Sequence, residues 1–263
     1  MTVQMVDDMG NAWTNGGDSL ELKEAGGGKE GSPRLKQVRV HDMGDGSHDV
    51  EYEADREGKM EVEVLVNGFP ISGSPFLVEV KRGVKLSMGA SAMTRGAIEY
   101  IGTQNWTRHF QNPHTTGDVL ATMSSAGNSD PSRLTQGPHH DGGDNYTANL
   151  PGSWVAVDLK RFRLAPDGYS LRSDAWHPTY YKLRRWRLEG SEDGERWTTL
   201  REHRDDASLI KERFSTATWS ITGFEGELFR HFRILQTGPN SSGYHCLTCA
   251  GLELFGMLVE EDE

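Results

Sequence analysis

The feature that most constrains the fold of this chain is a series of short runs between Trp154 and Met257 that are rich in β-branched and aromatic residues. These runs are WVAVDL, YYKLRRWRLEGSEDGERWTTL, ATWSI, ELFRHFRIL and GLELFG. Gly, Asp, Asn and Pro lie between them, and the pair Asp193-Gly194 supplies the positive φ angles that a tight hairpin requires. Short strands separated by such turns are typical of an all-β sandwich or jelly roll.

Apolar residues alternate along the first of these runs. Val155, Val157 and Leu159 fall on one face of the expected strand, and Ala156 and Asp158 fall on the other. Two later runs each depart from alternation by one residue: Leu183, Trp186 and Leu188, and Phe229, Phe232 and Ile234. Such a slip predicts a β-bulge or a strongly twisted strand, as curved sandwiches use.

Five ordered blocks in this part of the chain resemble the discoidin family, whose coagulation-factor-type C domain is a galactose-binding-like jelly roll. The blocks are SWVAVDL, YSLR, WRLEGSEDGERW, FRHFRI and GLELFG, and the likeness covers roughly residues 96–259. It is nearer to the intracellular branch found in HECT-type and BTB-type ubiquitin ligases, in which a lead-in like Gly102-Thr103 and Asn112-Pro113 precedes the sandwich. The resemblance implies a jelly roll whose loops at one end meet ligands, but it does not identify the ligand.

The first part of the chain also consists of alternating runs, which predicts a second, smaller sandwich. Its phrases DDMGN, GGD, DGSHDVEY and ISGSPF resemble a filamin-type immunoglobulin-like repeat, and ISGSPF is the most specific of them. Two departures are visible: the strand that opens a full repeat is absent before Thr2, and residues 24–32 form a Gly-rich loop. We therefore expect the chain to be a fragment, or another segment to cover the exposed edge.

The predicted organisation is a filamin-type repeat at 1–82, a linker at 83–97, a discoidin-like domain at 98–259 and an acidic tail at 260–263. The linker prediction depends on KLSMGASAM, which has small residues and no strong period. The fold class is thus all-β, with an immunoglobulin-like sandwich followed by a discoidin-like jelly-roll sandwich.

The overall charge and hydropathy limit the classes of partner that this chain is expected to bind. A net charge of −11 disfavours a nucleic acid or an anionic membrane surface as the partner. No run of about 18 apolar residues is present, so no membrane insertion is expected. The first residues lack a basic and apolar leader, and the 2 cysteines are too few for a disulfide framework, so a cytoplasmic location is the expectation.

Loops at the end of a jelly roll are the expected binding surface, because binding residues concentrate in loops on a rigid scaffold. The loop residues best suited to contact a ligand are aromatic, His and Arg side chains: Trp106, His109, His139, Arg172, Trp176, His177 and Tyr244. Trp106 and Trp176 could equally be loop residues that pack beneath their own domain.

Three other sequence patterns could form a binding site, but each also has a purely structural explanation. Asp141 and Asp144 form a weak calcium candidate in a Gly-rich loop with His139 and His140, and no other cofactor is expected. Cys246 and Cys249 have the spacing of a metal knuckle, but they are better interpreted as small residues at the start of the last buried strand. The basic cluster 182–187 is interpreted as a solvated sheet face with salt bridges.

The filamin-type repeat offers a further site, because its relatives accept an extended partner strand at a sheet edge. By position, this edge would comprise Leu20, Leu22, Val38 and Val40. The alternative is that these four side chains are simply core.

No catalytic motif is present in the sequence, and no pair of carboxylates stands out as a glycosidase pair. We therefore predict a non-enzymatic module or scaffold that binds another protein, in a ubiquitin-ligase or cytoskeletal context. The alternative is a carbohydrate-binding module of the discoidin type.

Overall fold

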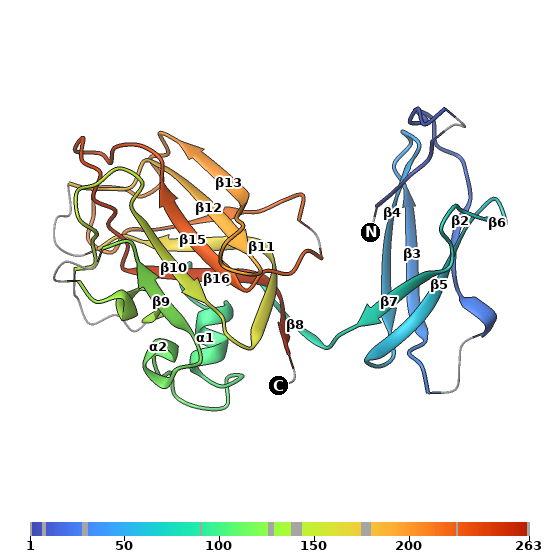
Figure 1. Ribbon diagram of the computed structural model, residues 1–263, viewed down its shortest axis with the longest axis horizontal. Coiled ribbons are helices and arrows are strands. Elements are labelled where there is room, and N and C mark those ends of the chain that lie inside the picture. The colour runs from blue at the N-terminus through green and yellow to red at the C-terminus, as the bar shows by residue number, and fades with distance from the viewer. Residues whose placement is uncertain are drawn as a thin grey trace. The chain divides into compact units, whose positions relative to one another are not determined.

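The computed structural model describes residues 2–6, 9–27, 31–89, 91–125, 129–137, 144–174, 180–224 and 226–261. The chain divides into two compact units, Met1–Arg82 and Gly83–Glu263. Both units are built mainly of antiparallel strands (Figure 1), which confirms the all-β prediction.

The first unit is a sandwich of two sheets. One sheet has the strand order β1-β4-β3, and the other has the order β2-β5-β6, with β7 pairing a further stretch of β5. The strands are β1 (Thr2–Gln4), β2 (Leu20–Glu24), β3 (Leu35–Asp42), β4 (Ser47–Ala54), β5 (Gly58–Val66), β6 (Phe69–Pro70) and β7 (Phe76–Val80). A short 3₁₀ segment, η1 (Ala25–Gly27), follows β2.

Alternation along the strands decides which side chains form the core of the first unit. In β5, Met60, Val62 and Val64 are buried between the sheets. The turn after β5 has positive φ at both Asn67 and Gly68, as a type I′ hairpin requires. The predicted immunoglobulin-like sandwich is therefore confirmed.

The second unit is a larger sandwich of two antiparallel sheets. One sheet has the order β13-β12-β15-β10-β9, and the other has the order β14-β11-β16-β8. The five strands of the first are β9 (Leu120–Met123), β10 (Trp154–Asp158), β12 (Arg185–Ser191), β13 (Thr198–Arg204) and β15 (His231–Gln236). The four strands of the second are β8 (Gly83–Leu86), β11 (Phe162–Arg172), β14 (Thr216–Ser220) and β16 (Gly251–Glu260).

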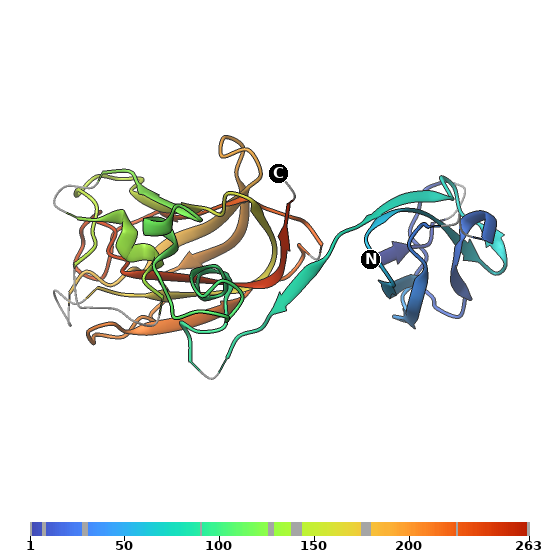
Figure 2. The ribbon, with the colours of Figure 1, turned by 90° about the horizontal axis from the view of Figure 1, so that it is seen from below.

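One apolar core fills the space between these two sheets, with Trp186, Phe232 and Leu254 among its fully buried side chains. Three short helical segments flank the sandwich: α1 (Ala97–Gly102), α2 (Pro113–Thr116) and η2 (Pro131–Thr135). The view from below shows α1 and α2 close together beside the sheets (Figure 2). The predicted discoidin-like sandwich is confirmed.

The loops that join the strands of the second unit gather at one end. The described residues 180–184 and 237–250 lie at this end, on the left of Figure 1. The register of β8 on β16 pairs Gly83 with Val259, so the start of the unit lies beside the end of its last strand. We call the end that holds 180–184 and 237–250 the loop end.

The departures from alternation have a different main cause from the predicted bulge. A register shift is present between Leu188 and Glu189, where β12 faces β13. However, Leu183 lies in the loop before β12, and Phe229 pairs with Leu164 of the other sheet. The slip therefore marks places where the chain enters a strand or crosses between sheets.

Two boundaries differ from the prediction. Residues Gly83–Leu86 are not linker but form strand β8, whose Leu86 side chain is buried in the core. Glu260 is the last residue of β16, and the Glu261 amide donates to the Arg161 carbonyl, so the acidic tail is partly built into the sheet. The sequence did not reveal β8 because its pairing partner lies about 170 residues further along the chain.

Candidate functional site: a tyrosine cluster at the loop end

A tight turn at residues 240–244 is held by one buried side chain. The Asn240 Oδ1 accepts hydrogen bonds from the amides of Ser242 (3.0 Å) and Tyr244 (3.1 Å). Its Nδ2 donates to the Cys246 carbonyl (3.0 Å), and Gly243 supplies a φ of +82°. Because the amide side chain bonds to both arms of the turn, the backbone that carries Tyr244 is held in one conformation.

A second segment, residues 180–182, is bonded to this turn. The amides of Tyr181 and Lys182 donate to the hydroxyls of Ser242 (3.1 Å) and Ser241 (3.0 Å). The Thr248 hydroxyl donates to the Tyr181 carbonyl (2.7 Å). Tyr181 has a φ of +58°, a left-handed conformation that costs roughly 1–2 kcal/mol in a residue with a side chain. The surrounding bonds offset this cost.

Together the two segments present three aromatic rings, Tyr180, Tyr181 and Tyr244, which we call the tyrosine cluster. The ring centroids of Tyr181 and Tyr244 are 5.5 Å apart, and those of Tyr180 and Tyr181 are 6.3 Å apart. Tyr180 is 55% exposed and Tyr244 is 46% exposed. Large aromatic side chains that stay exposed on a rigid support are suited to contact a partner.

Lys182, next to the cluster, is buried and anchors the loops from within. Its Nζ donates to the Ser173 hydroxyl (2.9 Å) and to the Glu212 carbonyl (2.8 Å). Burial lowers the pKa of Lys182 and raises the pKa of the buried Asp174 to about 6, while each charge opposes the shift of the other. The interpretation of Lys182 as part of a solvated sheet face was therefore wrong, although Arg187 does pair with Glu202 across β12 and β13.

Arg172 was predicted to lie on an exposed rim, but the structure buries it. Only 5% of Arg172 is exposed. Its guanidinium donates to the carbonyls of Gly137 (2.8 Å) and Ala250 (3.0 Å), and burial lowers its pKa to about 10. Arg172 therefore positions two loop segments, and it is not a surface contact.

Trp106 and His109 lie in the segment between α1 and α2. Trp106 is 44% exposed, and its ring meets Tyr100 edge-on at 5.0 Å. It therefore combines the two roles that the sequence left open, because one edge packs on its own unit and the rest is exposed. His109 is exposed.

Four predicted residues lie outside the described ranges: His139, Asp141, Trp176 and His177. Asp144 is described and half-buried. Among the described residues, no group of three or more His, Cys, Asp or Glu side chains is arranged to hold a metal ion. Cys246 and Cys249 are free thiols, and burial raises the pKa of Cys249 to about 11.

Tyr180 and Tyr181 were not predicted as partners of Tyr244, since they lie about 60 residues from it in the chain. Both were predicted to lie in a strand, whereas β12 begins only at Arg185. The signal that could have found them is the pair of serines after Asn240, whose hydroxyls meet the amides of 181 and 182.

The most elaborate polar cluster of the second unit is closed to ligands. The His203 ring forms hydrogen bonds with the Tyr169 hydroxyl (2.7 Å) and with the Asp206 carboxylate (2.7 Å). The ring of Trp186 stacks on His203 at 4.0 Å, and the Trp219 indole donates to Asp206 (3.0 Å). Because these groups are buried and satisfy one another, they stabilise the core and have no access to a substrate.

In the first unit, the residues proposed for strand addition lie on two edge strands. Within the described residues, β2 pairs only with β5, and β3 pairs only with β4. Leu20 and Leu22 are buried, whereas Val38 is 37% exposed and Val40 is half-buried. The two leucines are thus core residues that also lie on an edge strand.

The profile of the Filamin/ABP280 repeat family matches residues 1–77. The first unit is a filamin-type repeat. Its two sheets and the edge positions of β2 and β3 are the elements on which the strand-addition prediction depends.

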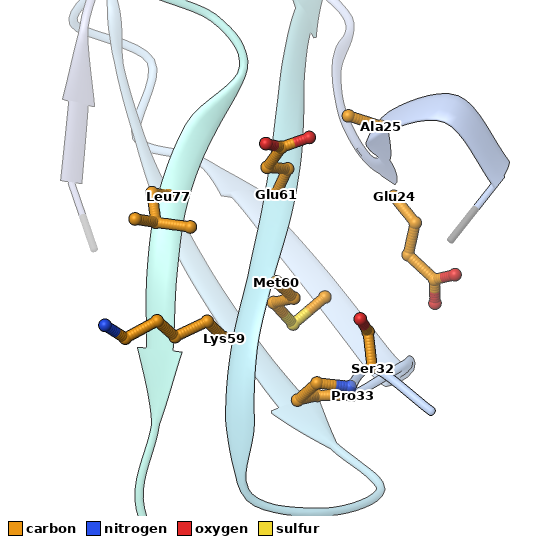
Figure 3. A pocket seen from close by; sticks show the side chains of 8 residues that line it. All are labelled: Glu24, Ala25, Ser32, Pro33, Lys59, Met60, Glu61 and Leu77. Carbon is orange, nitrogen blue, oxygen red and sulfur yellow. The ribbon is translucent and has the colours of Figure 1, made fainter. Parts of the chain in front are cut away.

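A small pocket lies at the end of β2 in the filamin-type repeat and is shown in Figure 3. It is lined by Glu24, Ala25, Ser32, Pro33, Lys59, Met60, Glu61 and Leu77. The Glu24 carboxylate accepts from the Leu35 amide (2.7 Å) and so joins β2 to β3. With a volume of about 120 Å³, the pocket is below the usual size of a ligand site.

Three curated proteins are similar to part of this chain. The E3 ubiquitin-protein ligase Ufd4 of Drosophila melanogaster is 37% identical over 172 residues, which are 62% of this chain and 6% of that ligase. The E3 ubiquitin-protein ligase hecd-1 of Caenorhabditis elegans is 35% identical over 176 residues, 63% of this chain and 6% of that ligase. A BTB/POZ domain-containing protein of Arabidopsis thaliana is 31% identical over 173 residues, 62% of this chain and 21% of that protein. The chain therefore spans only a small part of each.

Solved structures similar to this chain include carbohydrate-binding proteins. A Clostridium perfringens CBM32 module in complex with GalNAc-β-1,3-galactose has a TM-score of 0.42 at 15% identity, covering 53% of this chain and 96% of its own. The lectin domain of lectinolysin complexed with Lewis B antigen has a TM-score of 0.42 at 15% identity, covering 52% and 92%. The sugars belong to those proteins, and shared fold does not transfer a ligand. Among the described residues, no helix combines the length and hydrophobicity needed to cross a bilayer.

Proposed function

We propose that this chain is a non-enzymatic module that binds another protein, and that the tyrosine cluster is its main contact surface. The observation that carries the proposal is the exposure of Tyr244 on a turn whose backbone is fixed by buried Asn240, and of Tyr180 on the segment that is bonded to this turn. Tyrosine buries a large area with little loss of side-chain freedom, so such residues contribute strongly to binding.

The rigidity of the turn favours binding, because a surface that is already ordered loses little entropy on association. Ser241 and Ser242 fix the neighbouring segment to the same turn, and Lys182 anchors it from below. The two exposed rings are therefore held in place before a partner arrives.

A catalytic role is not supported by the described residues. In the second unit, burial raises the pKa values of Asp174 and Glu253 and lowers that of His203, and all three residues are buried. These pKa shifts follow from burial, and the three side chains lie among the groups of loops, core and helix rather than in an open cleft. We infer that any enzyme activity of a longer parent protein resides outside these units.

The similarity to two ubiquitin ligases supports a more specific proposal, that the module recognises substrates for a ligase. The matched residues make up only 6% of either ligase, so the similarity alone does not establish substrate recognition, and we propose it here. The filamin-type repeat is also compatible with a cytoskeletal partner that adds a strand at β2 or β3.

The test uses the full chain as bait in a cell lysate. We compare proteins retained by the wild type, by a Tyr180→Ala/Tyr244→Ala variant, and by a Phe69→Ala control, which removes an aromatic ring that is 76% exposed in the other unit. A retained protein is then purified, and its Kd is expected to rise by about tenfold or more only for the tyrosine variant. Equal binding by all three would refute the tyrosine cluster as the contact surface.

A carbohydrate ligand is the second candidate function for the same surface. The exposed rings of Tyr180 and Tyr244 could stack against the apolar face of a sugar. A glycan array probed with the wild-type chain and with the tyrosine variant distinguishes this candidate, since only carbohydrate binding would give signals that the variant loses.

A further inference from the structure

One end of the filamin-type repeat exposes a group of large apolar side chains that its core does not use. They lie on the loop after β1 and on the turn between β3 and β4, which are at the same end of the unit (Figure 1). The four side chains are Val6, Met9, Trp13 and Met43, and we call them the apolar patch. Met9 is 87% exposed and Met43 is 61% exposed. Single exposed apolar residues are ordinary, but several on adjoining turns indicate an interaction surface.

Backbone hydrogen bonds join the loop to the turn. The Trp13 amide donates to the Met5 carbonyl (2.9 Å), and the Met5 amide donates to the Gly46 carbonyl (3.0 Å). Val6 also forms a β-bridge with Ala12. The loop is thus held on the turn before any partner binds, and an ordered surface loses little entropy on association.

Trp13 packs directly on Gly46 of the turn. Gly46 is buried with a φ of +82°, and a Cβ at this position would collide with the Trp13 carbonyl. The same turn carries Met43, whose amide donates to the Ser47 carbonyl (3.0 Å). Trp13 and Met43 therefore belong to one surface, although they are about 30 residues apart in the chain.

The segments that form this end carry negative charge. Residues 1–20 and 41–50 contain six aspartates, and neither stretch of the sequence contains a Lys, an Arg or a Glu. Among the aspartates whose positions the structure describes, Asp42 and Asp45 flank Met43 in the turn itself. The apolar patch is therefore bordered by carboxylates.

The carboxylates of Asp42 and Asp45 are bonded, but not to cations. Asp42 accepts from the amides of Gly17 (2.7 Å) and Gly44 (2.9 Å), and Asp45 accepts from the amide (3.0 Å) and the hydroxyl (2.6 Å) of Ser47. These bonds lower the pKa of both carboxyls, so both are charged at neutral pH. Their negative charge is left for a partner to complement.

This charge excludes several kinds of partner. An anionic membrane surface or a nucleic acid would be repelled by the aspartates. A second copy of this chain, using the same surface, would bring the same aspartates against each other. A partner that combines apolar side chains with Lys or Arg fits both features of this surface.

The backbone of this end favours a helical partner over an added strand. The amides of Met5, Trp13 and Met43 already donate to carbonyls of the same unit, and β1 has only three residues. An added strand would therefore find few free groups for a ladder. An amphipathic helix satisfies its own backbone and binds through side chains, and unbranched methionines adapt to such a face.

We propose that the apolar patch and the aspartates beside it bind one basic amphipathic helix of a partner protein. The apolar side chains of the helix pack against Trp13 and Met43. Its Lys or Arg side chains lie beside Asp42 and Asp45. This surface is separate from the tyrosine cluster, which belongs to the other unit, and it uses none of the four residues of the predicted strand-addition edge.

The test titrates the full chain with a synthetic peptide of about 18 residues, with Leu at helical spacing and Lys elsewhere. NMR follows the indole N–H signal of Trp13, which is assigned by its loss in Trp13→Phe. We expect the peptide to shift this signal. One matched peptide has Glu in place of Lys, and another has the same composition without helical spacing. Each should bind about tenfold more weakly or worse.

Variants locate the binding by calorimetry. Trp13→Ala/Met43→Ala should raise the Kd of the Lys peptide by about tenfold or more, because it removes the centre of the patch. Leu77→Ala is the matched control and should leave the Kd unchanged, since it truncates an exposed side chain of β7 in the same unit. Unchanged amide signals of β5 verify that the filamin-type repeat of each variant is folded.

A third variant tests the charge without removing apolar surface. Asp42→Asn/Asp45→Asn keeps an oxygen that can accept the backbone bonds but removes both charges. Its Kd for the Lys peptide should be about threefold to tenfold higher than that of the wild type. The Kd of this variant should also respond less to added salt, because salt screens exposed charges.

Four results would overturn the proposal. The first is the absence of binding by the Lys peptide, and the second is equal binding by either matched peptide. The third is an unchanged Kd in Trp13→Ala/Met43→Ala or in Asp42→Asn/Asp45→Asn, or a Kd that rises equally in Leu77→Ala. The fourth is a larger shift of the Trp13 signal with phosphatidylserine vesicles, which would assign the patch to a membrane surface.

Discussion

The two sandwiches of this chain are stabilised in different ways. In the filamin-type repeat, a small apolar core around Leu20 and Met60 fills the space between the sheets, and His48 is the one buried polar side chain among its described residues. In the discoidin-like unit, a much larger apolar core is accompanied by buried ionisable side chains, among them Arg172, Lys182 and Glu253.

The difference follows from how much irregular backbone each unit must hold. The filamin-type repeat has the larger share of its residues in strands, whose backbone groups bond to each other. The discoidin-like unit also holds α1, η2 and the long segments of the loop end, whose amides and carbonyls need other partners. Buried polar side chains supply these partners, as Glu253 does by accepting bonds from the amides of Ile98 (2.7 Å) and Glu99 (3.1 Å).

The largest expected effect is the loss of stability when a buried side chain is truncated in each of the two cores. Trp186→Ala should destabilise the discoidin-like unit by about 3–5 kcal/mol, because Trp186 is fully buried and its ring stacks on His203. Met60→Ala should destabilise the filamin-type repeat by about 2–3 kcal/mol, since a small core can relax into the space. Hydrogen exchange measured by mass spectrometry reports each unit separately. A loss of protection in both units from either substitution would contradict the division into two compact units.

The next effect tests the buried charge at the loop end. Arg172→Met should cost about 2–3 kcal/mol, because it leaves the carbonyls of Gly137 and Ala250 without their donor in a buried site. Hydrogen exchange should increase first at residues 129–137 and 244–250, ahead of the sheets. If protection at these loops is unchanged, Arg172 does not position them and its burial has another cause.

The third effect, which is small for each pH unit, is a decrease in the stability of the discoidin-like unit between pH 4.5 and 8. Burial raises the pKa of Glu253 from 4.5 to about 8, so the folded unit holds a proton that the unfolded chain releases above 4.5. Its contribution is complete below pH 4.5 and is lost as the pH rises towards 8, with a slope of at most about 1.4 kcal/mol per pH unit. Glu253→Gln should flatten this part of the stability curve, as measured by urea unfolding at several pH values. Identical slopes for wild type and variant would show that Glu253 is charged in the folded unit.

Much of the fold could be predicted from the sequence, because strands and turns depend on local properties. Alternation in WVAVDL and EVEVLV, and the turn at Asn67-Gly68, correspond to strands and a turn of the structure. The tight hairpin predicted at Asp193-Gly194 was wrong, because residues 192–197 form a longer loop between β12 and β13, in which Gly194 has a positive φ. The two sandwiches follow from these signals. Helix α1 was not predicted, since it is only six residues long and its amides are capped by Glu253, about 155 residues away in sequence.

The candidate site could be predicted only in part. Tyr244 was predicted as a surface contact and is half-exposed, but Arg172 was assigned to the same surface and is buried. A sequence indicates that a residue is charged or aromatic. It does not indicate whether carbonyls from distant loops surround that residue, and burial depends on those contacts.

The sequence by itself therefore determined the strands, the turns and the two families that the chain resembles, because backbone preference and side-chain alternation act over a few residues. The tertiary structure alone decided that β8 joins β16, that Tyr180 and Tyr181 meet Tyr244, and that Trp13 packs on Gly46. These features depend on strand register and on contacts between segments far apart in the chain, which no local pattern specifies.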